Sequence, residues 1–549
     1  MTVTMSSSSQ KYVLSGLTPS SAITAPPDTQ RWLRTEVCPW QAIWLAARAS
    51  TVERLSPWMM YKTACIYRSA CLNHKFNLNK HGYSIVVNNL SNHSSIFGLV
   101  ISTIVVAGGI VANPPIGMTD NGLTATAIFF ATLLLWLTHT VPYMISSVTA
   151  VMLLYALGVT NSVQAAASGF SSSLVFFLLL LFLLGNTISE VNLDAQLADR
   201  LLGSEDSPTR ALRSLTTALL PLAVFMPSAA ARTVALIPVV RRLRTSFDLS
   251  SNSDFSQTAF LILGQVNPLA SVGLMTGGGM AVVTAGLIHS LVGPLTWVQW
   301  ALYMVPPAAA LYLLGAVSVF ALYPLDYADI PEPRNKKTTA GFDREQRIVA
   351  AVMSGTVLAW IIGSFFGIPT ILPAAAAVLI LALPNIRIIR ADAVANVSWN
   401  VLFLVGAMFS LLEALTNTGV VNLLINRTLE TIPLNALPVF ASVGILLLVA
   451  VGVRIVFSTG SAALLVIVPF ALRIGKELGV NQLYLSFSLL IVIGGTTFLP
   501  FNTTSALLAY EEGPLKQRDI ARFGVVTLFL SLGVVAVAWL FYWPLVSSV

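Results

Sequence analysis

The feature that most restricts the fold of this chain is a series of apolar runs, each roughly twenty residues long. A run of this length matches a bilayer core crossed by an α-helix. Hydrophobic residues make up 56% of the chain and charged residues only 10%, too little charge to cover a water-soluble protein of 549 residues. Strand-like alternation is absent from the runs. The sequence therefore predicts an all-α polytopic membrane protein in contact with the lipid bilayer.

The positive formal charge of +7 does not require a nucleic-acid partner. Its basic residues gather in the connections between apolar runs, where the positive-inside rule accounts for them. No His, Asp or Glu cluster stands at metal-ligand spacing, so we expect neither an enzyme nor a resident metal cofactor.

Residues 1–93 differ from the rest, because they are polar and basic and contain no span. We predict a disordered N-terminal extension here. Three interpretations stay open: an organellar transit peptide, a cytosolic tail, and a true start at Met59 or Met60.

We predict about eleven spans in two repeats, 94–323 and 347–549, joined by a basic cytosolic linker, 324–346. The expected spans are 95–112, 122–139, 142–158, 172–190, 257–288, 299–323, 347–366, 368–384, 399–418, 482–509 and 524–546. Six spans before the linker place the N-terminus in the cytosol. Two amphipathic stretches, 192–202 and 420–430, are predicted to lie on the membrane surface.

Two further apolar segments, 211–240 and 436–472, are predicted to enter the membrane and return as hairpins. Basic residues flank the first on both sides, and a crossing would leave one basic group outside. Prolines and small residues interrupt it, with a tip at 227–231. The second is interrupted at 458–461. The segment SAAARTVALIP (228–238) resembles TGSAALLVIVP (459–469), which indicates a repeat. The span count makes the two halves inverted, as in secondary transporters.

The hairpin tips and the broken spans 257–288 and 482–509 point to a binding site. Irregular backbone at membrane depth leaves polar groups that need partners. Helix N-termini suit an anion, while free carbonyls and hydroxyls suit a cation such as sodium. The polar residues at the breaks are Ser228, Ser271, Thr276, Ser458, Thr459, Ser461, Thr496, Thr497, Asn502, Thr503 and Thr504. The alternative for each residue is close helix packing.

Two arginines lie within the hairpins, Arg232 and Arg454. A charge at membrane depth is costly and suggests function. Three interpretations stay open: a cation that binds the anion, a fixed charge in place of sodium, and a partner for nearby carbonyls or carboxylates. His139 ends a span and could titrate, although a structural role is the simpler interpretation.

Three segments resemble the divalent anion/sodium symporter family, within the ion-transporter superfamily. WLTHTVPYMISSVTA (136–150) is similar to the family's W-x-T-E-A-I-P segment, with His139 where a Glu is usual. Asn113-Pro114-Pro115 and RDIARFG (518–524) resemble two further family segments. The resemblance covers about 94–549 and implies a dimer in which a scaffold moves a transport domain.

The resemblance also implies the site residues. Those expected at the substrate are Ser228, Ala229, Ala230, Thr459, Gly460, Ser461, Thr503 and Thr504. Those expected at a coupling cation, taken as sodium, are Ser228, Gly273, Thr276, Ser458, Thr459, Gly495 and Thr496. The family's hairpin tips read Ser-Asn-Thr, and neither tip here retains the Asn.

The expected function is secondary active transport of a small divalent anion, sulfate or a di- or tricarboxylate, by alternating access. Sodium-coupled symport is the leading hypothesis. Sodium-independent anion exchange, or transport of another oxyanion, is the alternative. An ion channel would need a continuous polar stripe, and the paired hairpins argue against it. We expect a homodimer in the plasma membrane, or in an organellar membrane if 1–93 is a transit peptide.

Overall fold

The computed structural model describes residues 3–5, 12–14, 97–202, 207–226, 228–323, 341–431 and 436–547. The chain divides into two units, Met1–Ser94 and Ser95–Val549. In the first unit, strand β1 (Val3–Met5) pairs antiparallel with β2 (Tyr12–Leu14). The remainder of the predicted extension 1–93, most of the predicted linker (324–340) and Pro227 at the first tip lie outside the described residues.

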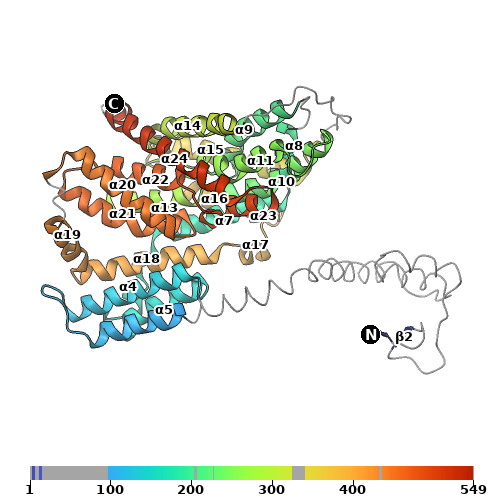
Figure 1. Ribbon diagram of the computed structural model, residues 1–549. Helices are drawn as coiled ribbons and strands as arrows, with labels where there is room; N and C mark the ends of the chain where they lie inside the picture. The colour runs from blue at the N-terminus through green and yellow to red at the C-terminus, as the bar shows by residue number, and fades with distance from the viewer. Residues whose placement is uncertain are drawn as a thin grey trace. The chain divides into compact units, whose positions relative to one another are not determined.

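The elements that the structure describes in the second unit are helices (Figure 1). Its first half contains Phe97–Val111, α4 (Asp120–Thr138), α5 (Tyr143–Ala156), α6 (Val163–Ala166), the 3-10 helix η3 (Ser168–Ser171), α7 (Ser173–Glu190), α8 (Leu193–Leu202), α9 (Pro208–Phe225), α10 (Ala229–Ser246), α11 (Asp254–Leu261), the π-helical turn η4 (Ile262–Val266), α12 (Asn267–Ala270), α13 (Gly279–Leu291) and α14 (Trp297–Leu322).

The second half begins after the linker. It contains α15 (Arg344–Phe365), α16 (Ile371–Ala382), α17 (Ala391–Ala395), α18 (Trp399–Asn417), α19 (Val420–Thr431), α20 (Val439–Val456), α21 (Gly460–Glu477), α22 (Gln482–Gly495), the 3-10 helix η6 (Pro500–Asn502), α23 (Thr504–Glu512), α24 (Gln517–Val537), the π-helical turn η7 (Ala538–Tyr542) and α25 (Trp543–Ser547).

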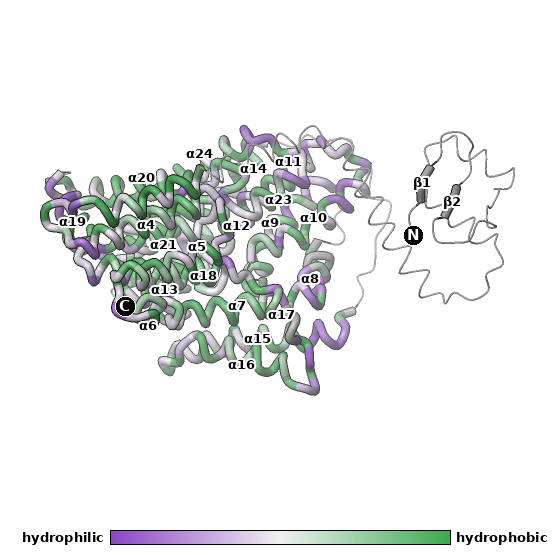
Figure 2. Tube along the Cα trace, turned by 90° about the horizontal axis from the view of Figure 1, so that it is seen from below, coloured by the Kyte–Doolittle hydropathy of each residue, from purple (hydrophilic) through white to green (hydrophobic). Residues whose placement is uncertain are grey.

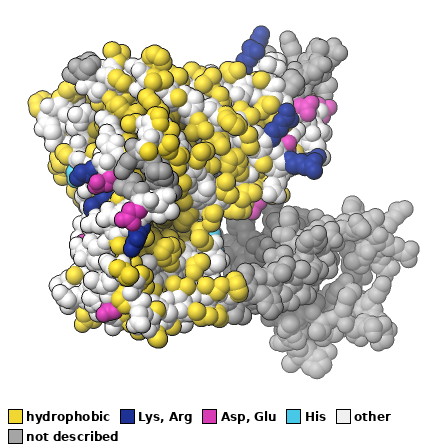
Figure 3. Space-filling view, turned by 60° about the vertical axis from the view of Figure 1, so that its left-hand side comes forward, with side chains coloured by type: hydrophobic (Ala, Val, Ile, Leu, Met, Phe, Trp, Pro, Cys, Tyr) yellow, Lys and Arg dark blue, Asp and Glu magenta, His cyan; other side chains and the backbone are white. Residues whose placement is uncertain are grey.

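Seven of the described helical stretches are long and apolar enough to cross a membrane, and five shorter apolar helices accompany them. Hydrophobic residues run along most of the helices, with polar stretches mainly near their ends (Figure 2). Apolar side chains also cover most of the face seen in Figure 3, where charged side chains gather mainly toward its two sides. These features agree with the all-α polytopic prediction. The count of about eleven spans stays a prediction, since α20, assigned to a hairpin, is among the seven long helices.

Each predicted hairpin is a pair of helices that pack against each other: α9 with α10, and α20 with α21 (Figure 1). We call these pairs the first and second hairpin. The connection of the first is shorter than expected, because α10 already begins at Ala229. Pro221, expected to interrupt the segment, lies inside α9. A proline removes one helical hydrogen bond and bends the helix, but surrounding contacts can keep the helix continuous.

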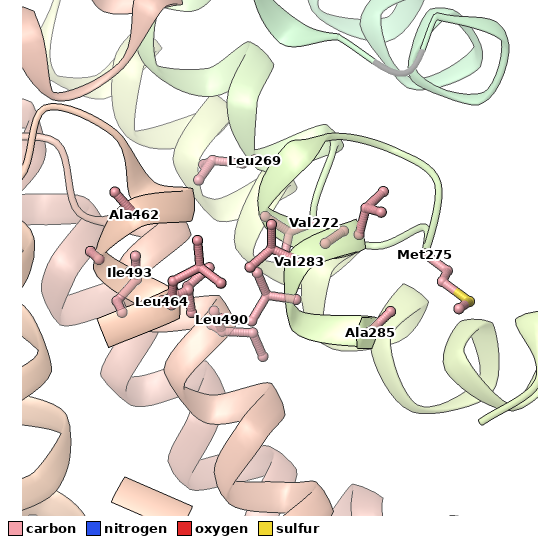
Figure 4. Packing of buried hydrophobic residues seen from close by; sticks show 14 of the residues in the cluster. Leu269, Val272, Met275, Val283, Ala285, Ala462, Leu464, Leu490 and Ile493 are labelled. Carbon is pink, nitrogen blue, oxygen red and sulfur yellow. The ribbon is translucent and has the colours of Figure 1, made fainter. Parts of the chain in front are cut away.

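The broken span of the first half packs against the second hairpin. Helix α13 contacts α21 and α22, and α12 contacts α22. Figure 4 shows Leu269 and Val272 on one side of this interface and Leu464, Leu490 and Ile493 on the other. Close van der Waals packing is what holds helices together where lipid surrounds them. The interface brings the breaks of both halves into one region.

Helix α18 crosses to the first half and packs against α5 and η3. Its closest approach is at Gly169, where an added Cβ would collide with the carbonyl oxygen of Gly406. The backbone amide of Met144 also donates to Asn400 Oδ1 over 3.1 Å. These contacts place the beginning of α5 beside the beginning of α18, on one wall of the cavity described next.

Candidate substrate site

A cavity of about 320 Å³ lies where the breaks of the two halves meet. Residues from both hairpin connections and both broken spans line it, together with side chains of α5, α7 and α18. The lining residues are Tyr143, Leu178, Leu181, Phe182, Gly185, Asn186, Ser189, Ser228, Ala229, Ala230, Ala231, Pro268, Ser271, Val272, Thr276, Gly278, Gly279, Met280, Ala281, Val282, Ser398, Val401, Leu404, Thr459, Gly460, Ser461, Ala462, Asn502, Thr503, Thr504 and Ser505.

Four helices begin at this cavity: α10, α13, α21 and α23. In three of them a hydroxyl caps the first turn. Ser228 accepts from Ala231 N, Thr459 from Ala462 N and Thr503 from Ala506 N, over 3.1–3.3 Å. A cap of this kind leaves earlier N–H groups of the first turn without helical partners. Four such N-termini give the cavity a positive potential suited to an anion.

Behind the first connection lies Arg232, which is fully buried. Its Nε donates to Asn267 Oδ1 over 2.7 Å, and its two terminal nitrogens donate to the carbonyls of Met226 and Asn267 and to Ser271 Oγ. Asn267 in turn donates to Ala229 O over 2.8 Å. The arginine therefore ties the end of α9 to the break of the first broken span.

Behind the second connection lies Arg454, which is 1% exposed. It donates to the carbonyls of Phe457, Ile493 and Asn502. The Asn502 side chain accepts from Leu499 N over 3.0 Å and donates to Phe457 O over 3.1 Å. The second arginine thus ties the end of α20 to the break of the second broken span.

The two arginines donate to carbonyls at equivalent positions of the two repeated segments. Met226 and Phe457 are the residues that end α9 and α20, and the alignment of the two tip segments pairs them. Arg232 reaches its carbonyl from the helix after the connection, whereas Arg454 reaches from the helix before it. Among the residues that the structure describes, no carboxylate forms an ion pair with either guanidinium. Both positive charges are therefore held by neutral oxygens, next to the cavity.

All eight residues expected at the substrate line the cavity. Of the residues expected at a cation, Ser228, Thr276 and Thr459 also line it. The other four do not: Gly273 packs against α14, Gly495 against Ser531, Ser458 bonds Tyr143, and Thr496 bonds its own helix at Val492 O. In the described parts of the chain, no group of three His, Cys, Asp or Glu side chains could hold a metal ion.

Sequence reasoning missed the wall formed by α5, α7 and α18, which carries Tyr143, Asn186, Ser189 and Ser398. Nothing local marks these side chains as cavity-lining, although Tyr143 lies in the family-like segment 136–150. Only the packing of α18 across the two halves brings them to the cavity.

Comparisons with known proteins bear on the whole second unit. Residues 93–549 match the family model described as the sodium:sulfate symporter transmembrane region. A membrane protein of Cupriavidus necator is 22% identical over 482 residues, which is 83% of this chain and 93% of the relative. L-tartrate/succinate antiporters of Shigella dysenteriae and Escherichia coli are each 26% identical over 406 residues, which is 70% of this chain and 82% of each relative.

Proposed function

Because the chain belongs to the sodium:sulfate symporter family, we propose that it exchanges small dicarboxylates across the membrane without coupling to sodium. The family itself makes the chain a membrane-embedded, multi-pass transporter of small anions and not an enzyme, so these two predictions are confirmed. The finer assignment, which anion and which coupling, is the proposal.

The cavity supports a small organic dianion as the cargo. Its volume of about 320 Å³ is at the small end of ligand pockets. Four helix N-termini and two buried guanidinium groups favour negative charge, while the apolar lining around Leu178 and Val401 suits a short carbon chain. The relatives named as L-tartrate/succinate antiporters support a dicarboxylate over sulfate.

The single observation that carries the coupling is the position of the two arginines. A sodium ion needs free oxygens, and the carbonyls at both connections already accept from Arg232 and Arg454. A fixed positive charge there would also repel a second cation. These residues therefore fit sodium poorly. The family's tips read Ser-Asn-Thr, and the absence of the Asn from both tips of this chain also argues against a sodium site.

Fixed charges also explain why exchange is favoured over one-way transport. In a symporter, sodium leaves together with the substrate. The empty site then carries neither the positive charge of sodium nor the negative charge of the substrate. Arg232 and Arg454 cannot leave, and an empty site would carry two positive charges through the bilayer at high cost. A bound dianion neutralises them in each direction. Each crossing then requires cargo, which is the definition of exchange.

The proposal includes alternating access by two inverted repeats, a homodimer and a plasma-membrane location with a cytosolic N-terminus. The repeat is supported by the two tip segments and the equivalent carbonyls. Protease protection of an N-terminal tag in sealed vesicles would test the orientation. The mass of the purified complex would test the dimer.

The decisive experiment uses proteoliposomes preloaded with succinate and supplied with radiolabelled L-tartrate. We expect rapid uptake that requires internal dicarboxylate and is unchanged when choline replaces sodium. Uptake that needs an inward sodium gradient and ignores the internal anion would instead establish symport. A parallel arm with labelled sulfate tests the alternative cargo.

A pair of variants tests the site assignment. In Ser228→Ala with Thr459→Ala, two caps are lost from the N-termini at the cavity, and we expect exchange to fall strongly with normal expression. The matched control is Ser290→Ala with Ser318→Ala, which removes two hydroxyls that bond their own helices outside the cavity. Equal transport by both double variants would remove the site assignment.

A further inference from the structure

A polar cluster joins the corner between α4 and α5 to the second hairpin. Tyr143 Oη lies 2.9 Å from His139 Nε2 and 2.9 Å from Ser458 Oγ, and His139 Nε2 lies 3.1 Å from Ser458 Oγ. Tyr143 also lines the cavity, and Ser458 directly precedes the residue that caps α21. Of the three side chains, Tyr143 lines the cavity, while His139 and Ser458 contact it from behind.

The tautomer of neutral His139 follows from its second ring nitrogen. Nδ1 lies 3.2 Å from the carbonyl oxygen of Leu137. A carbonyl can only accept, so Nδ1 carries the proton and Nε2 is an acceptor. His139 itself has a left-handed backbone conformation, with φ of 50°, which ends α4 and turns the ring toward the hairpin.

Counting protons shows what a charge on His139 changes. With neutral His139, one hydroxyl of the Tyr143–Ser458 pair donates to Nε2 and the other donates to its neighbour. Both hydroxyl protons are then used within the cluster. With cationic His139, Nε2 donates instead, and the two hydroxyls need only one proton between them. One O–H is released, and Tyr143 is the member of the pair that lines the cavity.

We propose that His139 is a positioning residue whose protonation releases the Tyr143 hydroxyl as a donor to the bound dicarboxylate. This inference rests on the proposed function, since it concerns the same cavity. It makes dicarboxylate affinity rise as the pH falls and His139 gains a proton. It also assigns Tyr143 to substrate binding, a role that no local pattern in the sequence indicates.

Other ionisable groups on the elements packed around this corner do not replace His139. Asp120 and Tyr155 lie at the far ends of α4 and α5, and the adjacent helix Phe97–Val111 has no ionisable side chain. On α20, Arg454 bonds three backbone carbonyls.

On α18, α19 and α21, which also pack around this corner, the ionisable groups are bonded elsewhere or lie far along the helix. Glu413 of α18 accepts from Ser168, and Arg427 and Glu430 of α19 pair with each other. The remaining ionisable groups of α21 occupy its last turns, away from the connection: Arg473, Lys476 and Glu477. Within the described residues, His139 is thus the one histidine of this cluster.

The test is calorimetric binding of L-tartrate to the purified full chain in buffers from about pH 5 to about pH 8, the conditions under which a histidine switch is looked for. L-tartrate suits it because both its carboxyls stay ionised over most of the range. For the native chain we expect affinity to rise roughly tenfold toward low pH, the worth of one hydrogen bond to a charged group. His139→Gln and Tyr143→Phe should each flatten this profile, and the double variant should add nothing further.

His289→Gln is the matched control, because His289 is an exposed histidine in the last turn of α13 and does not line the cavity. It should keep the native profile. A profile of His139→Gln parallel to that of the native chain would overturn the inference, even if exchange itself is intact. Absence of any L-tartrate or succinate binding would overturn the proposed function, and this inference with it. Thermal unfolding of each variant shows whether a lost profile is only lost folding.

Discussion

Replacing Arg454 by Met tests whether a fixed charge stands where a cation would otherwise bind. The substitution keeps an apolar chain of similar length but removes three hydrogen bonds, to the carbonyls of Phe457, Ile493 and Asn502. At about 1.5–3 kcal/mol for each bond to a charged group, the gross loss is about 5–9 kcal/mol. Removing a buried charge recovers several kcal/mol of desolvation, so the expected net destabilisation is about 1–4 kcal/mol.

The destabilised variant should respond to sodium, although the native chain should not. With the guanidinium gone, carbonyl oxygens face a space without positive charge, which suits a small cation. Sodium at ten times its dissociation constant would restore about 1.4 kcal/mol by mass action. The assay is thermal unfolding of the detergent-purified protein in sodium chloride and in choline chloride.

Arg427→Met is the matched control, since Arg427 is an exposed arginine that pairs with Glu430 on the surface. It should lose less than about 1 kcal/mol and show no sodium effect. The reasoning is refuted if sodium stabilises the native chain more than Arg454→Met. It is equally refuted if Arg454→Met retains full stability and sodium-independent exchange.

Three further predictions are checked by unfolding and exchange assays. Gly460→Ala should impair exchange, because its Cβ would collide with Met280 Sδ, and adding Met280→Ala should restore exchange. The control is Gly444→Ala in α20, which has open space around it. This change should be neutral or should stabilise the protein by about 0.5–1 kcal/mol. Asn502→Ala should cost about 1–3 kcal/mol, because the amide of Leu499 and the carbonyl of Phe457 lose their partner. Arg241→Ala should cost less than about 1 kcal/mol, because its ion pair with Glu512 is half exposed.

Helix positions were largely predictable, because apolar runs and capping residues are local. The predicted tips, 227–231 and 458–461, overlap the two connections but extend into the first turns of α10 and α21, which begin at Ala229 and Gly460. The predicted substrate residues all line one cavity, since small and hydroxyl residues at a break leave backbone groups open to a ligand. Pro221 was misread as an interruption because its effect depends on the surrounding packing, which the sequence does not display.

The partners of the arginines could not be chosen from the sequence. Three interpretations were open for Arg232 and Arg454, and the contacts that decide among them include residues 35 and 48 positions away, Asn267 and Asn502. The Tyr143 wall is a stronger case, since its contact with Ser458 spans 315 positions. Such a pair depends on how α5 packs beside the second hairpin, and one sequence contains no measure of that packing.

The different origins of the two arginines argue that the charge at each connection has a function. Arg232 follows its connection and Arg454 precedes its own, so they do not descend from one position of the repeated segment. Yet each guanidinium reaches the equivalent carbonyl, at Met226 or Phe457, and each joins a hairpin to a broken span. A structural need for hydrogen bonds alone could be met by neutral side chains, as Asn502 does at Phe457. A buried charge without a carboxylate partner is costly. Such a charge lies at both connections, although the two arginines occupy different positions of the repeat. We infer that the positive charge itself contributes to function. In a cavity built on four helix N-termini, the proposed function gives that contribution a physical form, the retention of a dianion.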